Sequence, residues 1–436
     1  MKRTLWQNTC TGNNNARESN MGTAENAGLS SARLATLDQV MTERYVDSGA
    51  MPGYHAMIYR KGVLAHNSTV GSMDLERNKA TQEDAIYRLH SMSKPIVAVA
   101  LMMLVEEGKL GLADDVHRHI PSWKDLGVIA HGIPTESVDT PTQFVTVPPK
   151  RPMKVVDLAT HTSGLTYGFM SRTMVDAAYR VQKIGDPQTL GGLDEFIEQL
   201  SRLPLDFSPG EQYNYSVSID VLGYLVQLLS GQTLGEFLRT RLFEPLQMND
   251  TAFFVPEEKI DRFTSNYRLN PDGGGLVLYD DAAASTYAVP PKLESPDLVS
   301  TAADYMRFCQ MMLNGGTLDG VQILSPKTVA MFSQNFLPDG KLMSEMILAE
   351  NLLSGPANDG IGHSIGCGVT VDTAQSRVSG TPGDFFWGGA ASTGFWIDPK
   401  EQLAVVFMTQ VMGSDARLTR DLRTLVYSAF TDSLDW

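Results

Sequence analysis

Apolar residues recur along the chain with two different periods, and these periods predict both helices and strands. Between residues 29 and 45 they follow roughly helical spacing, which predicts an amphipathic helix. The segment YHAMIYRKGVLAHN follows Pro52-Gly53 and predicts two strands joined by a turn at Arg60-Lys61-Gly62. Near the C-terminus, STGFWIDPKEQLAVVFMTQ predicts two more strands and SDARLTRDLRTLVYSAF predicts a final helix.

The middle of the chain has mostly helical patterns. Residues 118 to about 206 combine a loop rich in Pro and Thr, IPTESVDTPTQFVTVPPKRP, with helical pieces. Three longer helices are predicted from SIDVLGYLVQLLSG, TLGEFLRTRLF and STAADYMRFCQMMLNGG. The third opens on Thr301 and Asp304, which form a capping pair, and closes on Gly315.

The order of these elements predicts an α+β fold with two lobes. Strands come from both ends of the chain, so we expect one antiparallel sheet flanked by helices and carrying a helical insertion. We predict a mobile tail at residues 1–26, an α/β lobe at 27–117 and 207–436, and a smaller helical lobe at 118–206. A chain of 436 residues, 42% of them hydrophobic, is long enough to build both.

The composition limits the range of partners and compartments. The formal net charge is −15, and an acidic surface repels phosphate groups, so neither nucleic acid nor an anionic membrane is expected as a partner. The longest apolar run, Pro95 to Val105, is too short to span a bilayer, and the first residues show no secretory signal. Three widely spaced cysteines without a CxxC pair favour a reducing, cytoplasmic location. His117 and His119, at i and i+2, diverge and predict a solvated loop, so we expect no metal site.

Ser91 and Lys94 are the first candidates for catalysis. They stand one helical turn apart in RLHSMSKPIVAVALMMLVEEG, where Pro95 is typical of a first helical turn. Free N–H groups at a helix N-terminus would favour a developing anion beside Ser91. The serine hydroxyl needs a base to become a nucleophile. Lys94 can be that base only if its pKa is lowered, and we expect burial in the apolar run IVAVALMMLV to lower it.

Two alternatives stand beside this pair. About one SxxK sequence is expected by chance, in which case Ser91 only caps the helix and Lys94 extends to solvent. A rival nucleophile is Ser364 within Gly362-His363-Ser364-Ile365-Gly366, a literal GxSxG sequence. That motif needs a strand before the serine and a helix after it, whereas the flanks here predict a glycine-rich lead into a strand. We therefore favour Ser91.

Two further stretches carry groups that suit acyl transfer. FSPGEQYNYSVS, residues 207 to 218, brings Tyr213 and Tyr215 to the start of a helix, where a phenol near a lysine could relay a proton. FWGGAAS, residues 386 to 392, has two glycines that allow close backbone approach and could present an N–H group to an oxyanion. Core tyrosines and a simple bulge are the alternatives for these two stretches.

Taken together, the motifs resemble the serine β-lactamase and penicillin-binding-protein fold, and in detail the family VIII carboxylesterases related to class C β-lactamases. The resemblance covers most of the chain from about residue 27. It is carried by Ser91-Met92-Ser93-Lys94, Tyr215-Ser216-Val217 and Trp387-Gly388-Gly389, with support from His161-Thr162-Ser163-Gly164-Leu165-Thr166 and Leu298-Val299-Ser300-Thr301-Ala302-Ala303-Asp304. It implies an α/β lobe and a smaller helical lobe with the site between them.

The resemblance also implies a role for each residue. Ser91 matches the acylated serine, Lys94 its lysine partner and Tyr215 the tyrosine that shuttles the proton. The backbone N–H groups of Ser91 and Ala390 match the oxyanion hole. The substrate-binding wall is matched by Trp387, Gly388 and Gly389. The implied chemistry is acyl transfer through a covalent acyl-enzyme that water releases, with no cofactor.

Two departures from β-lactamases predict the substrate. Val217 stands where those enzymes carry the Asn of Tyr-x-Asn, and Trp387-Gly388-Gly389 replaces their Lys-Thr-Gly. Both polar groups that would hold an antibiotic are missing, so we expect a hydrolase of neutral, short-to-medium-chain carboxylic esters. Phe169, Met170 and Met174 could line an adaptable pocket or pack in the core. A β-lactamase, an acyltransferase and a non-catalytic ligand-binding relative remain as alternatives, and a homo-oligomer is left open.

Overall fold

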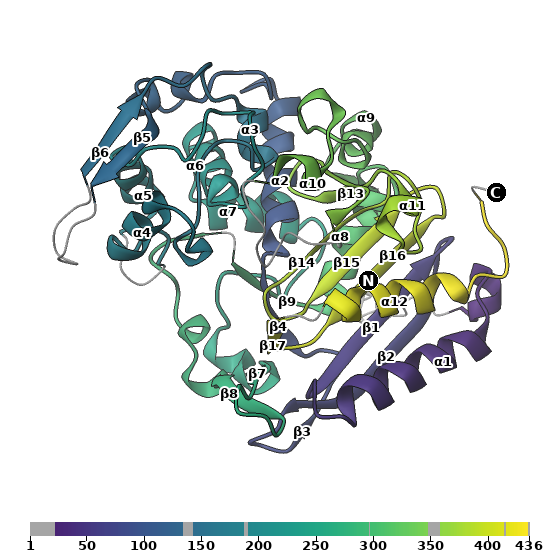
Figure 1. Cartoon of the computed structure of the whole chain (residues 1–436). Helices are drawn as coiled ribbons and strands as arrows, with labels where there is room; N and C mark the ends of the chain where they lie inside the picture. Colours follow the sequence, from purple (N-terminus) through teal and green to yellow (C-terminus); the bar gives the residue numbers. More distant parts are fainter. Residues whose placement is uncertain are drawn as a thin grey trace, which may run out of the picture.

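The central feature of the fold is an antiparallel sheet whose strands come from both ends of the chain (Figure 1). The computed structural model describes residues 22–133, 143–186, 191–295, 297–347, 358–413 and 416–434. The strand order is β12-β13-β14-β15-β16-β1-β2-β3. The strands are β1 (Gly53–Arg60), β2 (Val63–Asp74), β3 (Lys79–Ala80), β12 (Ile361–His363), β13 (Gly368–Thr370), β14 (Phe385–Gly388), β15 (Gly394–Asp398) and β16 (Leu403–Met408).

The register of the sheet joins the two ends of the chain directly. β1 pairs antiparallel with β16, which places His55 opposite Met408. β1 and β2 form the predicted hairpin, and Lys61 and Gly62 turn the chain with φ angles of 50° and 81°. The two strands predicted near the C-terminus are β15 and β16, which pair with each other. The predicted α+β class with an antiparallel sheet is therefore confirmed.

Helices cover both faces of this sheet. α1 (Ser31–Met41) and α12 (Ala416–Ser428) lie side by side over one face (Figure 1), and α8 (Ala302–Leu313) packs on β1, β15 and β16 from the other. Along β16, Val405 and Phe407 belong to the core under α1 and α12, whereas Val406 and Met408 belong to the core that includes α8. Alternate residues of a strand point to opposite faces, so a strand covered on both sides is apolar throughout.

A group of helices lies beside the sheet and packs around α2 (Ser93–Glu106). Every residue of α2 from Ser93 to Leu104 is buried, and α2 packs mainly on α6 (Ser218–Ser230). The neighbours of α6 are α3 (Val155–Ala159), α5 (Leu193–Leu200) and α7 (Leu234–Leu238). α4 (Met174–Val181) also lies in this part of the molecule (Figure 1).

A β-hairpin lies within residues 118–206, where the sequence was expected to form a loop and helices. β5 (Val128–Ile133) and β6 (Gln143–Val147) pair antiparallel, and residues 134–142 between them lie outside the described residues. The loop expectation was wrong because β6 shows no alternation of buried and exposed positions: all its residues are exposed except Phe144, which is partly buried. The 118–206 boundary of the helical lobe itself stays a prediction, as does the mobility of residues 1–26.

The remaining elements are short. β4 (Ile86–His90) pairs with β9 (Leu298–Thr301), and β17 (Val411–Met412), β7 (Asn266–Leu269) and β8 (Leu276–Asp280) form a three-stranded sheet. The others are β10 (Thr317–Leu318), β11 (Val321–Gln322), α9 (Pro326–Val329), α10 (Met343–Met346) and α11 (Thr373–Ser376). Within the described ranges, none of the helices combines the length and apolar character that a membrane crossing requires.

Candidate active site

Ser91 lies in the tight turn between the end of β4 and the start of α2. His90, the last residue of β4, has a φ of 47°, a left-handed conformation that is uncommon outside glycine. The hydroxyl of Ser93, the first residue of α2, accepts a hydrogen bond of 2.7 Å from the Leu298 N–H on β9. The turn is therefore fixed from a second strand, and Ser91 stands immediately before the helix N-terminus as the sequence predicted.

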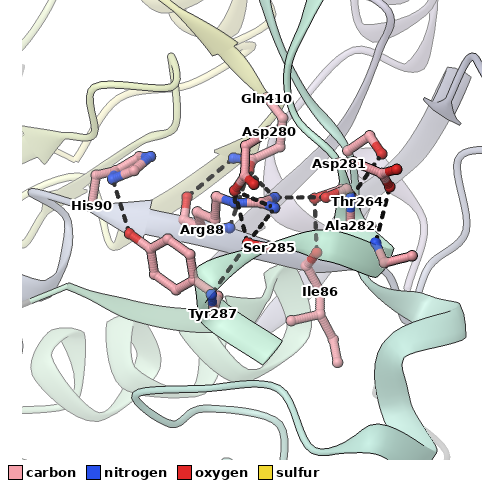
Figure 2. A network of polar contacts seen from close by, with 12 residues as sticks. Ile86, Arg88, His90, Thr264, Asp280, Asp281, Ala282, Ser285, Tyr287 and Gln410 are labelled. Atoms are coloured by element: carbon pink, nitrogen blue, oxygen red, sulfur yellow. Dashed lines mark hydrogen bonds and ion pairs between the residues drawn. The ribbon is translucent and has the colours of Figure 1, made fainter. Parts of the chain in front are cut away.

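A buried arginine holds the strand that leads to Ser91, as Figure 2 shows. The Arg88 side chain is fully buried, with its guanidinium 4.0 Å from the centre of the Phe263 ring. Its Nε donates to Asp280 at 2.8 Å, one terminal nitrogen donates to the Thr264 carbonyl at 2.6 Å, and the other donates to Ser285 Oγ at 3.1 Å. Arg88 was not among the residues predicted from the sequence, although a charged side chain inside the apolar strand Ile86–His90 was the available signal.

Residues 410–413 link β4 to the glycine-rich segment that follows β14. The Gln410 side chain accepts from the Arg88 N–H at 3.2 Å and donates to the Arg88 carbonyl at 3.1 Å. The next residues donate backbone hydrogen bonds to that segment, Val411 to the Ala391 carbonyl and Gly413 to the Ala390 carbonyl. Strand β4 and the Ala390 backbone are therefore held by one short stretch of chain.

The structure brings Ser91, Lys94 and Tyr215 together. Ser91 Oγ lies 2.5 Å from Tyr215 Oη and 3.2 Å from Lys94 Nζ. Lys94 is 5% exposed and Tyr215 is 6% exposed, so the two groups that could exchange a proton with Ser91 are both shielded from solvent. Tyr215 comes from the loop before α6, whereas Ser91 and Lys94 come from the start of α2.

The pKa of Lys94 departs from expectation. Burial lowers it, but the neighbouring Tyr215 oxygen and the Asp220 carboxylate raise it, and the net result lies above the ordinary lysine value. Asp220, at the start of α6, is buried and accepts hydrogen bonds from Ser295 Oγ at 2.5 Å and from Tyr167 Oη at 3.4 Å. The expectation of a lowered lysine pKa was wrong because the apolar run supplies only burial, while the opposing charge arrives from another helix.

Gly389 allows the chain after β14 to lie directly against the end of β4. A Cβ atom there would stand 2.2 Å from the Leu89 carbonyl oxygen and 2.3 Å from Thr393 Oγ1, so only glycine fits. The Gly389 N–H donates to the Thr393 carbonyl at 2.9 Å, which closes a tight turn around Ala390. Within the described part of the chain, the N–H groups of Ser91 and Ala390 have no acceptor, so both are free to donate to an oxyanion.

Aromatic and sulfur-containing side chains surround Tyr215. The Trp387 and Tyr167 rings lie 5.9 Å and 5.4 Å from the Tyr215 ring. Phe169 stacks on Tyr167 at 4.8 Å and is 65% exposed, and Met170 packs in the apolar cluster that includes Tyr215. Of the three residues considered for a pocket, Phe169 and Met170 therefore lie near the site. The third, Met174, packs instead against Gly132, where a Cβ would meet its sulfur at 2.4 Å.

Ser364 lies in a different environment. It is fully buried, and its Oγ donates to the Met331 carbonyl at 3.2 Å. β12 ends at His363 and the next element is β13, so the GHSIG sequence forms a strand–turn–strand connection without the helix that a nucleophile elbow requires. The geometry here suits a structural turn.

The comparison with known proteins places the chain in a family. The model of the Beta-lactamase family matches residues 37–428, and the chain belongs to that family. Protein Rv1367c of Mycobacterium tuberculosis is 32% identical over 378 residues, which is 86% of this chain and 89% of that protein. Esterase EstB of Burkholderia gladioli is 27% identical over 415 residues, 92% of this chain and 96% of the esterase.

A solved structure gives the same result for the fold. EstCE1, described as a hydrolase with promiscuous acyltransferase activity, is similar with a TM-score of 0.72 at 24% identity. The match covers 91% of this chain and 99% of that one. The predicted β-lactamase and penicillin-binding-protein-like fold is confirmed.

Proposed function

We propose that this protein is a carboxylesterase, a serine hydrolase that cleaves short-to-medium-chain esters through an acyl-enzyme on Ser91. The observation that carries the proposal is the position of Ser91 Oγ, 2.5 Å from Tyr215 Oη and 3.2 Å from Lys94 Nζ. A hydroxyl in contact with two proton-exchanging groups and next to free N–H donors is the arrangement that nucleophilic acyl transfer requires. The name of the relative EstB, an esterase, supports the same reaction class.

Each step of the proposed ester hydrolysis can be assigned to a group at the site. The Ser91 proton passes to the Tyr215 oxygen, which reacts as the phenolate beside the Lys94 ammonium, while the serine oxygen bonds to the ester carbonyl carbon and the N–H groups of Ser91 and Ala390 bind the oxyanion. Collapse breaks the bond to the alcohol oxygen, which takes the proton from Tyr215 and leaves. Water then gives a proton to the Tyr215 oxygen as its own oxygen attacks the acyl carbon. Collapse breaks the bond between the acyl carbon and Ser91 Oγ, which takes that proton back from Tyr215, giving the carboxylic acid and free Ser91.

Tyr215 is the primary proton acceptor in this scheme, and Lys94 supports it. Because the pKa of Lys94 lies above its ordinary value, through Tyr215 and Asp220 overcoming burial, Lys94 is an ammonium in the resting enzyme. An ammonium cannot accept a proton, but it stabilises negative charge on the tyrosine oxygen beside it.

The substrate preference follows from what surrounds the nucleophile. Val217 is fully buried, and it offers no amide to an antibiotic side chain. Trp387 places an indole ring beside Tyr215, where a lysine would otherwise attract a carboxylate. The site therefore favours neutral, apolar acyl groups, with Trp387, Gly388 and Gly389 along one wall.

A hydrolysis assay with purified variants tests the proposal. Hydrolysis of p-nitrophenyl butyrate should fall to background in Ser91→Ala and stay at the wild-type rate in Ser364→Ala, which removes the rival serine. Activity retained in Ser91→Ala would reject the mechanism. Loss only in Ser364→Ala would move the nucleophile to the GHSIG turn.

Acyl transfer to an alcohol is the second candidate, because the structurally similar EstCE1 is a hydrolase with promiscuous acyltransferase activity. Analysis of the products with an added alcohol separates the two, since only transfer yields a new ester. Turnover of a cephalosporin, measured beside an ester, tests residual β-lactamase activity in the same preparation.

Location and assembly are separate parts of the proposal. The cysteine content supports a cytoplasmic location, which cell fractionation tests. A homo-oligomer is tested by light scattering after size-exclusion chromatography.

A further inference from the structure

Four aromatic side chains meet behind Tyr215, and each has one polar atom without a hydrogen-bond partner among the described residues. These atoms are His161 Nε2, Tyr213 Oη, His363 Nε2 and Trp387 Nε1, and we call the four residues the ring cluster. His161, Tyr213 and His363 are 1%, 2% and 0% exposed. Buried polar groups are nearly always paired, because an unpaired one has lost its hydrogen bonds to water without compensation. Four such atoms in one place require an explanation.

The rings of the cluster are in mutual contact. The centre of the His363 ring lies 5.4 Å from that of His161, 5.5 Å from that of Tyr213 and 5.3 Å from that of Trp387. His161 and Tyr213 are 6.1 Å apart, and His161 lies 4.7 Å from Tyr215 itself. His363 is therefore the common neighbour of the other three, and the cluster directly adjoins the catalytic tyrosine of the proposed mechanism.

The tautomer of His161 is fixed by its backbone contact. The Ser216 N–H donates to His161 Nδ1 at 3.3 Å, so Nδ1 is an acceptor and the ring proton of the neutral imidazole lies on Nε2. A buried chain of hydroxyls through Ser216, Ser218 and Ser163 leads to the same nitrogen, with oxygen–oxygen distances of 2.7 Å. Burial lowers the pKa of His161 well below its ordinary value, which keeps the ring neutral.

His363 has the opposite tautomer. Its Nδ1 lies 2.7 Å from the Ser364 carbonyl oxygen, which can only accept, so Nδ1 carries the proton and Nε2 is a bare acceptor. Burial also lowers the pKa of His363, to about 4, so this ring is neutral at physiological pH. His161 thus offers a donor to the cluster and His363 offers an acceptor, while Trp387 adds a second donor and Tyr213 a hydroxyl that can do either.

We propose that the ring cluster is a binding site for one internal water molecule. A water has two protons and two lone pairs, and the cluster offers the complementary set. The water accepts from His161 Nε2 and Trp387 Nε1 and donates to His363 Nε2 and Tyr213 Oη. Internal waters typically make two to four hydrogen bonds to buried polar groups that would otherwise be unpaired.

A direct hydrogen bond between the two histidines is the competing arrangement. It would satisfy His161 Nε2 and His363 Nε2 but leave Tyr213 Oη and Trp387 Nε1 buried and unpaired. The water pairs all four atoms at once, so the composition of the cluster favours it.

The water has a consequence for catalysis, and this consequence rests on the proposed function. It joins Trp387, from the substrate wall, to His161, whose ring packs on Tyr215. His161, Tyr213 and His363 are therefore positioning residues, because they hold Tyr215 through the water-linked cluster without touching the reacting atoms. Loss of one partner should lower kcat more than it changes KM, since substrate contacts stay in place.

The first test looks for the water and the two histidine tautomers directly, without any substrate. A high-resolution crystal structure should show a water within about 2.7–3.2 Å of both histidine Nε2 atoms. Nitrogen-15 NMR of labelled histidines should find His161 protonated at Nε2 and His363 at Nδ1. An Nε2–Nε2 contact without water, or the reverse tautomers, would overturn the site, and neither result depends on whether the protein is an esterase.

The second test measures the positioning role by comparing the kcat and KM of two matched variants. Tyr213→Phe removes only the hydroxyl that contacts the water, and Tyr87→Phe removes another buried, unpaired hydroxyl that lies outside the ring cluster. We expect kcat for p-nitrophenyl butyrate to fall about 3- to 10-fold in Tyr213→Phe with KM unchanged, and to stay at the wild-type value in Tyr87→Phe. Equal kcat values in the two variants would reject the positioning role.

Discussion

The two sides of Ser91 are supported by buried polar groups of contrasting kinds. On the β4 side, Arg88 is a permanent cation whose nitrogens are paired with Asp280, Ser285 and the Thr264 carbonyl. On the Tyr215 side, the ring cluster is neutral, and its four unpaired polar atoms form the proposed site for one water molecule. The two sides therefore differ in what they hold: the paired charge of Arg88 fixes the strand that leads to Ser91, and the neutral rings pack against Tyr215.

The largest effect is expected on the charged side. Arg88→Met would leave the partly buried Asp280 without its ion-pair partner and the Thr264 carbonyl without the Arg88 donor, so the free energy of unfolding should fall by about 3–5 kcal/mol. Arg44→Met is the matched control, because Arg44 is half exposed in its ion pair with Asp421, and its loss should lower the free energy of unfolding much less. Urea unfolding of both variants measures the difference, and equal losses would contradict a special role for Arg88.

Lys94 lies where the two sides meet, and its removal should affect catalysis more than folding. We expect Lys94→Met to lower kcat by about 10²–10⁴-fold, the usual contribution of positioned proton-transfer groups. Because the pKa of Lys94 is raised above 10.5 in the folded protein, burial being outweighed by Tyr215 and Asp220, the lysine stays charged through neutral and mildly alkaline pH. The pH profile of the wild type should therefore show no alkaline rise from this group. A rise between about pH 6 and 9 that Lys94→Met abolishes would restore lysine as the base.

The ring cluster on the Tyr215 side should make the stability of the protein depend on pH in the acidic range. Burial lowers the pKa of His363 from 6.5 to about 4, so below pH 6.5 the unfolded chain binds a proton that the folded protein excludes. Stability present above pH 6.5 should be lost as the pH falls toward 4, by roughly 3 kcal/mol for this residue. Chemical unfolding at a series of pH values measures the slope. His363→Gln should flatten it, whereas His131→Gln, at an exposed position on β5, should not.

The smallest effect is expected at Ser364, whose side chain belongs neither to the Arg88 network nor to the ring cluster. Ser364→Ala removes one hydrogen bond to the Met331 carbonyl and should cost about 0.5–1.5 kcal/mol of stability with no loss of activity. Thermal unfolding together with the ester assay checks both halves of this prediction. A fall in kcat without a fall in stability would tie the GHSIG turn to the chemistry.

How much the sequence predicts depends on how local the signal is. The Ser91 and Lys94 pair is visible because one helical turn relates them, and the strands from both ends are visible because their hydrophobic runs are continuous. The raised pKa of Lys94 was missed because Asp220 and Tyr215 arrive from α6 and the loop before it, a contact that no local pattern encodes. The contact between Arg88 and Gln410 was missed for the same reason, because the two residues are 322 positions apart in the sequence. The β5–β6 hairpin was missed because β6 is exposed on both faces, with only Phe144 partly buried, and so lacks the alternation of a half-buried strand.

The pairing of β1 with β16 also has a consequence for how the protein is made. β1 ends at Arg60 and its partner strand does not begin until Leu403, so the N-terminal hairpin is synthesised long before that edge can be covered. At typical translation rates the interval lasts roughly tens of seconds, during which an apolar strand edge is open to wrong pairing. The sheet that supports the site is thus completed only near the end of synthesis, and newly made chains should depend on chaperones until then.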